Sequence, residues 1–201
     1  MAAIRDSELT RSKIVDVTAD EMRRHGYKAT SLSDIIAKAD ISKGALYHHF
    51  KNKLELAYAA FEEVFVVENI NFWKAQLVGD DPLSKFCEHL SNVPDYMTDD
   101  ELECGCPVNT ISQEMSAEDE GFRERTLAMY QQMQSLFLEA LKQCEQQGML
   151  RKDLKLERCA LFLLSSLQGI TSIAKASRDR ETIKQLTLAL QDYVNSLRKK
   201  G

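Results

Sequence analysis

The sequence has few of the residues that interrupt helices, and it lacks the long apolar runs that cross membranes. Only three of its 201 residues are proline and eight are glycine, so long uninterrupted helices are expected. The richest apolar stretch, residues 159–174, is broken by Ser165, Gln168 and Thr171, whereas a membrane-spanning helix needs about 20 consecutive apolar residues. Residues 1–13 contain no hydrophobic signal segment, and we therefore expect a cytoplasmic protein with no membrane partner.

Motifs for catalysis and for cofactor binding are also missing. The sequence has no phosphate-binding P-loop, no Gly-x-Gly-x-x-Gly dinucleotide fingerprint, no His-Glu-x-x-His zinc motif and no Gly-x-Ser-x-Gly nucleophile elbow. We therefore predict that the protein is not an enzyme, that it has no catalytic residues and that it holds no cofactor.

The five cysteines predict neither disulfides nor a metal site. Five is an odd number, and a chain without a secretion signal is expected to keep its thiols reduced. Cys87 and His89 are two residues apart on a predicted helix and therefore point to different sides. Cys104 and Cys106 are spaced as Cys-x-Cys rather than as the usual Cys-x-x-Cys knuckle, so no metal is expected.

Charge is distributed unevenly along an otherwise ordinary composition. Apolar residues make up 44% of the chain and charged residues 28%, which is typical of a soluble globular protein. Residues 1–60 hold ten Lys/Arg against eight Asp/Glu, and the remainder holds 16 against 23, so balances of +2 and −7 give the net charge of −5. A mildly basic first part on an acidic body suits a protein that contacts nucleic acid with one end only.

Helical spacing of apolar residues covers almost the whole sequence, with no strand-like alternation and no repeats. We therefore predict an all-α fold. Gly26, the segment Gly79–Pro82 and Gly148 are expected to end or separate helices. The stretch from Val93 to Pro107, with two prolines and an acidic patch, is expected to be mostly loop. The predicted helices include residues 8–25, 32–39, 42–48, 53–77, 121–146 and 180–198.

Residues 32–50 predict two short helices joined by a tight turn. This is the arrangement of a helix-turn-helix, whose second helix enters the major groove of DNA. The small residues Gly44 and Ala45 would let the backbone approach DNA closely, and Lys43 with the neighbouring hydroxyls could hold phosphates. Tyr47 and the two histidines that follow it could reach phosphates or base edges.

The same segment resembles a known family. The run from Gly26-Tyr27 through Thr30-Ser31 to residues 42–53, which read Ser-Lys-Gly-Ala-Leu-Tyr-His-His-Phe-Lys-Asn-Lys, resembles the signature of TetR (tetracycline-repressor-like) regulators over residues 10–56. One departure is Asp40, where the family usually has glycine. Asp tolerates the left-handed conformation better than most residues, so we expect an intact turn. By the resemblance, the DNA-contact positions are Ser31, Ser42, Lys43, Gly44, Ala45, Tyr47, His48, His49 and Lys53.

The resemblance also implies the rest of the architecture and the partners. It implies about nine helices, a three-helix DNA-binding domain over residues 1–53 with the helix from Lys53 as connector, and a ligand-binding and dimerisation domain over residues 54–201. A homodimer formed by the last two helices would bind a palindromic DNA operator, and a small-molecule effector would change the spacing of the two DNA-binding heads. Members of the family are most often repressors.

Aromatic, methionine and amide side chains of the body are the candidates for an effector pocket. Ordinary packing in the core is the alternative for each of them. No cationic cluster marks a site for a strongly anionic ligand. The candidates are Phe65, Trp73, Asn109, Gln113, Tyr130, Met133, Phe137 and Gln168.

The run Cys104-Gly105-Cys106-Pro107 keeps a second function open, namely thiol-based sensing of oxidants or electrophiles. A thiol at a helix N-terminus is more reactive than a free one, and a helix is expected to begin near Pro107. The acidic patch from Asp99 to Glu103 would disfavour the thiolate. Unreactive thiols at a loop-to-helix junction are therefore the other interpretation.

Overall fold

A computed structural model describes residues 2–199, and the side chains of residues 7–199. This part of the chain forms eleven α-helices and one π-helical segment, with no β-strand, which confirms the all-α prediction. In chain order the elements are α1 (Ala2–Ala29), α2 (Leu32–Ala39), α3 (Lys43–His49), α4 (Lys53–Ala60), the π-helical η1 (Phe61–Val66), α5 (Val67–Gln76), α6 (Pro82–Tyr96), α7 (Asp99–Cys104), α8 (Pro107–Met115), α9 (Glu120–Gln146), α10 (Leu156–Ser177) and α11 (Arg180–Ser196).

The described elements agree with the implied number of helices. α4, η1 and α5 continue into one another without a break and form one long helix, as expected for residues 53–77. With these three counted as one, and with the six-residue α7 left aside, nine helices remain within residues 2–199.

The chain divides into two compact units. The head unit consists of the described residues up to Glu68 together with Pro107–Thr126. The body unit consists of Asn69–Cys106 and the described residues from Leu127 onward. Helix α8 and the first turns of α9 therefore belong to the same unit as the predicted helix-turn-helix.

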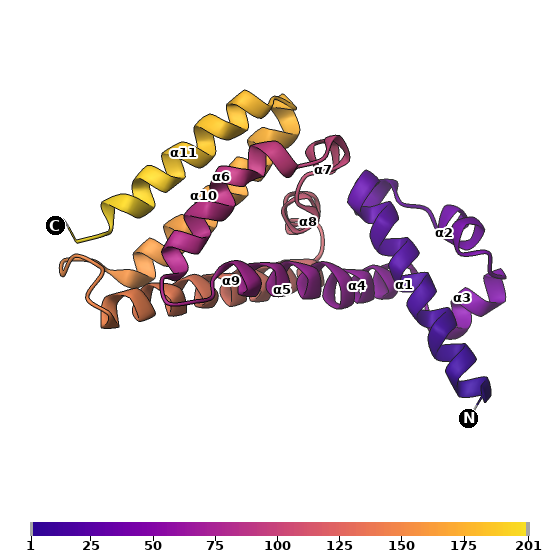
Figure 1. Cartoon of the computed structure of the whole chain (residues 1–201). Helices are drawn as coiled ribbons and strands as arrows, with labels where there is room; N and C mark the ends of the chain where they lie inside the picture. The colour runs from indigo at the N-terminus through magenta and orange to yellow at the C-terminus, as the bar shows by residue number, and fades with distance from the viewer. Residues whose placement is uncertain (1, 200–201) are drawn as a thin grey trace. The chain divides into compact units, whose positions relative to one another are not determined.

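Two serines start the short helices of the head unit, which follow α1 in Figure 1. The Oγ of Ser31 accepts a hydrogen bond from the amide of Asp34 in α2, and the Oγ of Ser42 accepts one from Ala45 in α3, both at 3.1 Å. Between them, Asp40 has φ 50° and ψ 55°. This is the left-handed conformation that the sequence predicts for Asp at a position where glycine is usual.

The inner faces of α2 and α3 are anchored on α1. Ile35 and Leu46 are fully buried, as is Met22 of α1, and each such side chain contributes about 1.5–3 kcal/mol by leaving water. Glu21, also on α1, is only 4% exposed and pairs with Lys38 of α2, with Nζ to Oε1 at 2.5 Å. The pair satisfies a carboxylate that would otherwise be buried without a counter-charge.

The long helix supplies aromatic side chains to the core of the head unit. Phe61 and Phe65 are buried, and their ring centres lie 6.3 Å apart. Phe61 also contacts Phe122 at the start of α9, with 6.1 Å between ring centres. On the surface, Arg11 of α1 pairs with Glu63 at 2.5 Å. The π-helical turn of η1 lies in this buried stretch. Such turns occur mostly as short insertions within α-helices.

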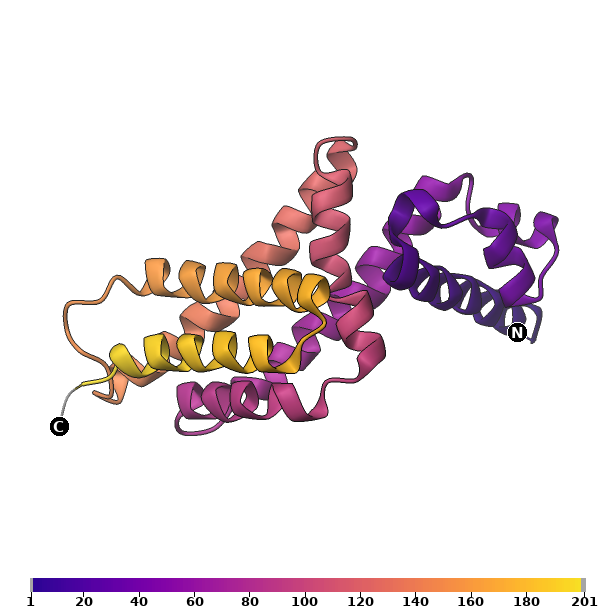
Figure 2. The same cartoon turned by 90° about the horizontal axis from the view of Figure 1, so that it is seen from above.

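In the body unit, α6 packs against α11, and α10 lies beside α11, as Figure 2 shows. Phe86 and Leu90 of α6 are buried, as are Ile183 and Val194 of α11. The rings of Trp73 and Phe86 each lie within 6 Å of Phe137 on α9, at 5.7 and 5.5 Å. These contacts make one apolar core.

The expectation that residues 93–107 are mostly loop is wrong. Helix α6 continues through Pro94 to Tyr96, and α7 occupies Asp99–Cys104. The Oγ1 of Thr98 accepts from the Glu101 amide while the Glu101 carboxylate accepts from the Thr98 amide. This capping box, with acidic residues in the first turn, stabilises a helix start. The acidic patch is therefore a helix signal, and Pro94 is tolerated close to the end of α6.

Helix α10 is the one described segment that is long and apolar enough, by length and composition, to cross a membrane. A third of its most apolar window is buried inside the protein. The core helix of a soluble protein has the same length and composition, so this is weak evidence for a membrane span.

A bidentate ion pair joins the start of α6 to the end of the described chain. Arg198 donates to both carboxylate oxygens of Asp81, at 2.9 and 3.1 Å. Asp81 also caps α6 by accepting from the Ser84 amide at 3.0 Å. Burial by itself raises the pKa of Asp81, but the hydrogen bonds from Arg198 and Ser84 and the charge of Arg198 lower it from 3.8 to about 2.

We predict that this pair stabilises the protein above pH 3.8 and is lost in acid. Below its ordinary pKa of 3.8 the carboxyl takes up a proton in the unfolded chain before it does so in the folded one, so the contribution disappears as the pH falls towards about 2. Partial exposure limits it to about 1–2 kcal/mol. The free energies of unfolding of the wild type and Asp81→Asn, measured with denaturant, should differ by that amount at about pH 6 and become equal near pH 2. A difference that does not change with pH would contradict the prediction.

Candidate nucleic-acid interface

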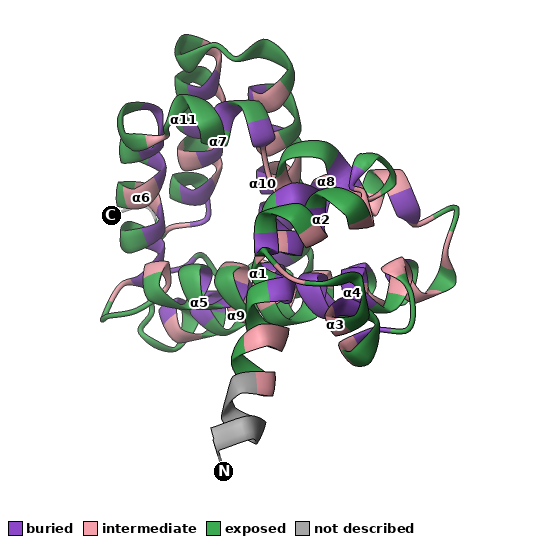
Figure 3. Cartoon of the chain, turned by 90° about the vertical axis from the view of Figure 1, so that its right-hand side faces the viewer, coloured by how far each residue is buried: buried purple, intermediate pink, exposed green. Residues whose placement is uncertain are grey.

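Helix α3 has a buried side and an exposed side (Figure 3). Apolar residues lie on the buried side and polar or small residues on the exposed side. Leu46 is fully buried and Phe50 is 3% exposed, which fixes the orientation of the helix. Tyr47 is 45% exposed, and the Nζ of Lys43 lies 5.9 Å from the centre of its ring. The exposed residues here are Ser42, Lys43, Gly44, Tyr47 and His48, with Ala45 and His49 half-buried.

Gly44 lies in the first turn of α3 and has no neighbour that would exclude a side chain. A Cβ added there would have only the Oγ of Ser42 near it, at 3.8 Å, which is an ordinary contact. Glycine in a helix costs up to about 1 kcal/mol relative to alanine, so the fold gains nothing from glycine at this position. The missing side chain leaves room for the close approach of an external partner.

Lys53 and Ser31, like Ser42 at the start of α3, combine a predicted DNA contact with a structural role. The Nζ of Lys53 donates to the carbonyl of Lys28 at 3.2 Å and lies 4.4 Å from the centre of the Tyr27 ring. Burial lowers the pKa of Lys53 from 10.5, and the charge of Glu114 opposes this. The Lys53 ammonium group has three N–H donors, so it can still donate to a phosphate. The Ser31 hydroxyl oxygen already accepts the hydrogen bond that caps α2.

The two histidines of α3 lie against each other, with ring centres 5.1 Å apart. Burial, and then the charges of His48 and Arg11, lower the pKa of His49 from 6.5. His49 is therefore uncharged at neutral pH, where it can donate or accept a hydrogen bond but contributes no charge to phosphate binding.

A carboxylate from α8 is bonded to the kink of α1. Gly26 has φ 75° and ψ 176°, so the helical geometry breaks there as the sequence predicts. After the break, the amides of Tyr27 and Lys28 donate to the two oxygens of Glu114, at 2.8 and 2.7 Å. A Cβ on residue 26 would lie 2.6 Å from the Glu114 Oε2. Only glycine combines this conformation with this approach.

A second polar contact joins α4 to the start of α9 in the head unit. The hydroxyl of Tyr58 donates to the Oδ1 of Asp119 at 2.5 Å, and the same oxygen accepts from the amide of Phe122 at 2.8 Å. The Arg125 guanidinium lies 3.9 Å from the centre of the Tyr58 ring. Burial, followed by the bond to Asp119, raises the pKa of Tyr58 to about 12, so its hydroxyl remains a donor. No local sequence signal marks Glu114 or Asp119, because their partners are distant in the chain.

The predicted effector residues fall into two groups. Phe65, Asn109 and Gln113 belong to the head unit, where Gln113 is exposed and the other two are buried. In the body unit, Trp73 and Phe137 are in contact. The body unit also contains Tyr130 and Gln168, both half-buried, and the buried Met133.

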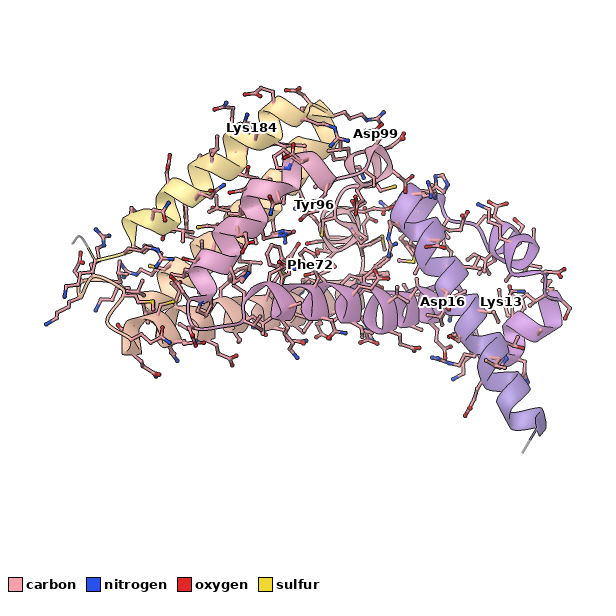
Figure 4. The ribbon with its side chains drawn as sticks, viewed as in Figure 1. Lys13, Asp16, Phe72, Tyr96, Asp99 and Lys184 are labelled. Atoms are coloured by element: carbon pink, nitrogen blue, oxygen red, sulfur yellow. The ribbon has the colours of Figure 1, made fainter. Side chains whose placement is uncertain are left out.

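The body unit contains a cleft of about 480 Å³ between α5 and α6. Phe72 comes from α5 and Tyr96 from the end of α6, as labelled in Figure 4. His89 of α6 lies between them, with its ring 5.1 Å from Phe72 and its Nδ1 2.9 Å from the Tyr96 hydroxyl. The sequence pattern suggests only a metal-ligand role for His89, whereas the structure places its ring in this aromatic cleft. The described residues include no group of three or more that could hold a metal ion.

The two candidate redox cysteines differ in access. Cys104, at the end of α7, is only 5% exposed. Cys106, just before α8, is half-buried and lines a second cleft of about 200 Å³ in the body unit, together with Tyr96, Met97 and Thr171. A reagent can therefore reach Cys106 more readily than Cys104.

Comparison with known proteins gives a consistent result. Residues 14–60 match the model of the bacterial regulatory proteins of the tetR family, and residues 81–190 match that of the tetracyclin repressor-like C-terminal domain. The chain is 24% identical over 190 residues to the HTH-type transcriptional repressor DhaR of Mycobacterium sp., covering 92% of this chain and 93% of that one.

Solved structures share the fold. A TetR-family transcriptional regulator from Cytophaga hutchinsonii superposes with a TM-score of 0.87 at 21% identity, over 98% of both chains. The reduced form of NemR from E. coli superposes with a TM-score of 0.80 at 18% identity, over 95% of this chain and 98% of that one.

We predict that Gly26→Ala destabilises the protein more than Gly148→Ala does. Both glycines have positive φ, at 75° and 71°, so both substitutions cost backbone strain. Gly26 also has ψ 176°, a conformation open essentially to glycine alone, in which alanine costs about 1–3 kcal/mol. Only at position 26 would the new Cβ also displace Glu114, because nothing lies within 4 Å of a Cβ at position 148. Thermal unfolding should show that Gly26→Ala lowers the free energy of unfolding by about 1–3 kcal/mol more than Gly148→Ala does. Equal losses would show that the contact with Glu114 adds nothing.

Proposed function

Because the chain belongs to the tetR family of bacterial regulatory proteins, and is therefore a DNA-binding transcription regulator, we propose that it is a ligand-responsive repressor that binds a palindromic operator as a homodimer. The family is one of transcription regulators, not enzymes, and we infer that this chain has no catalytic activity and acts in the cytoplasm.

The outer face of α3 is the main support for the proposal that the protein binds DNA. Leu46 and Phe50 anchor the helix on its inner side, and Lys43 and Tyr47 stand exposed on the other. Gly44 leaves space that the fold itself does not use. A helix held in this way, with a cationic side chain, an aromatic hydroxyl and a bare backbone in its first turns, can lie in the major groove with its N-terminal residues on the bases and phosphates.

The exposed faces of α10 and α11 support the homodimer. Leu161, Phe162 and Ile173 of α10 are 45–54% exposed, and Leu188 of α11 is 43% exposed. On α10 they share one face with Gly169, and no atom lies within 4 Å of a Cβ built there. An apolar helix face with a small residue at its centre fits against a second copy of the same face. Two heads would then read two operator half-sites one helical turn apart.

For the effector, the body unit offers a cleft of a size that suits a small molecule. Trp73 and Phe137, both predicted effector residues, pack against each other in this unit, and Trp73 contacts His89 in the cleft with 5.5 Å between ring centres. We propose that occupation of the body unit by a small molecule changes the affinity of the protein for its operator.

A second candidate function is thiol-based sensing at Cys106. The observation that favours it is the position of this thiol in a cleft, whereas the thiol of Cys104 is buried. Modification of this thiol would add bulk inside the cleft, beside Tyr96 and Thr171.

We predict that the protein binds a duplex containing the DNA upstream of its own gene and that Lys43→Ala with Tyr47→Ala abolishes this binding. The affinity should fall at least tenfold between about 50 and 200 mM salt, because phosphate contacts release counterions. Fluorescence anisotropy measures both effects. Absence of binding to any duplex at low salt would disprove the proposed function.

Gly44→Ala provides a matched variant in which stability and DNA binding change in opposite directions. The thermal stability should stay the same or rise, by up to about 1 kcal/mol, because alanine is the better helix former. The operator affinity should fall at least about tenfold because the new methyl group occupies the surface of closest approach. A variant that binds as tightly as the wild type would remove Gly44 from the interface.

For the second candidate, iodoacetamide is a suitable probe, since it forms an S–C bond with a thiol and releases iodide. We predict that if Cys106 is a sensor, alkylation releases the operator from the wild type and from Cys104→Ser but not from Cys106→Ser. Mass spectrometry should locate the adduct at Cys106. Release that persists in Cys106→Ser would exclude this cysteine as the sensor.

A further inference from the structure

The cleft between α5 and α6 has a chemical character that restricts what it can bind. Three of its lining side chains are large, apolar and exposed: Phe72 at 43%, Val78 at 55% and Tyr96 at 50%. Side chains of this size are seldom left open to water together in one concave site unless the site has an occupant. The cleft volume of about 480 Å³ lies within the range of small-molecule sites.

Three aromatic rings surround His89 of the cleft, two of them edge to face and the third tilted. The His89 ring is 5.1 Å from Phe72 with 74° between the planes, and 5.5 Å from Trp73 with 85° between the planes. Tyr96 lies on the other side, at 5.7 Å and 42°. Rings in these orientations present edges and faces to a further flat ring, and each such contact stabilises a bound aromatic molecule beyond the area it buries.

The cleft carries no net charge at neutral pH. Lys85 and Glu88, its two ionised lining residues, pair with each other at 2.8 Å. Burial lowers the pKa of His89 from 6.5. Burial, and then the charge of Glu101, raise the pKa of Tyr96 to about 12. Both groups are therefore neutral, and a charged ligand would lose its hydration without meeting an opposite charge.

One hydrogen-bonding group is available in the apolar part of the cleft. The Tyr96 hydroxyl lies 2.9 Å from Nδ1 and 3.1 Å from Nε2 of His89. A hydroxyl has one donor hydrogen and two acceptor lone pairs, so one bond to the histidine leaves capacity for a ligand atom. The amides of Gln76 and Asn92 are also among the lining residues and could bind further polar atoms.

From these observations we propose that the cleft formed by Phe72, His89 and Tyr96 binds an uncharged, flat aromatic molecule with a hydroxyl or carbonyl oxygen placed on the Tyr96 hydroxyl. As the identity of an effector, this rests on the proposed function; as a binding site, it stands on the cleft alone. A phenol-type molecule of one or two rings has the required shape, neutrality and single oxygen.

Trp73 provides a direct measurement of occupation. It is the only tryptophan in the chain, it is 8% exposed, and it contacts both Phe72 and His89. A protein labelled with ¹⁵N therefore has a single indole N–H resonance, and a ring bound beside His89 should shift it. The probe is 2-naphthol, with 2-naphthoate and 2-naphthylmethylammonium as charged molecules of the same shape.

We expect 2-naphthol to shift the indole resonance and to bind measurably by calorimetry, with each charged analogue at least about tenfold weaker. Phe72→Ala and Tyr96→Phe should each weaken 2-naphthol binding several-fold, up to about tenfold. Leu9→Ala is the matched control, because Leu9 is an exposed apolar side chain of α1 that lies outside the body unit. Its affinity for 2-naphthol should equal that of the wild type.

Three results would overturn the proposal: no 2-naphthol binding at its solubility limit, equal or tighter binding of either charged analogue, or unchanged binding in both Phe72→Ala and Tyr96→Phe. The proposed function is tested separately by adding 2-naphthol to the complex with DNA. Binding at the cleft without a change in operator affinity leaves the site standing and removes its role as an effector site.

Discussion

The carboxylate of Glu114 holds together a part of the molecule that the chain order would separate. Tyr27 and Lys28 are 87 and 86 residues away, yet their amides donate to its two oxygens. Both amides directly follow the break in the helix at Gly26, where the first N–H groups of a helix need a partner from outside it. Bonds from backbone N–H groups to an anion are among the stronger hydrogen bonds in proteins. This contact reinforces the packing of α8 against α1 and η1, which places α8 in the head unit with the helix-turn-helix although it lies in the second half of the sequence.

The head unit separates residues that maintain the fold from residues that are free to bind. Ser31 and Ser42 cap helices, Asp40 forms the turn, and Glu21 forms an ion pair with Lys38. Lys43, Gly44 and Tyr47 have no comparable structural role. Lys43 is an exposed cation, Gly44 has open space beside it, and the ring of Tyr47 is exposed. Substitutions in the first group should therefore lower stability and DNA binding together, whereas substitutions in the second should weaken DNA binding without lowering stability.

Local signals in the sequence are sufficient for the helix-turn-helix but not for the contacts that join distant segments. The caps, the turn at Asp40 and the break at Gly26 follow from the residues at those positions. The segment from Val93 to Pro107 was misjudged because proline and clustered acids also occur in loops, whereas here the acids form the first turn of a helix capped by Thr98. Glu114, Asp119 and Asp81 are surface-type residues in the sequence, and only the three-dimensional arrangement brings them to Tyr27, Tyr58 and Arg198.

Tyr96 is shared by the two candidate sites of the body unit, the aromatic cleft proposed to bind a ligand and the smaller cleft that contains Cys106. It lines the aromatic cleft with Phe72 and His89, and it also lines the smaller cleft that contains Cys106. A ring bound in one cleft and an adduct formed in the other would both contact Tyr96. A ligand that moves Tyr96 should change the rate of Cys106 alkylation, and an adduct on Cys106 should change the affinity of the aromatic cleft. By linkage, the equilibrium part of any such coupling has the same magnitude in both directions.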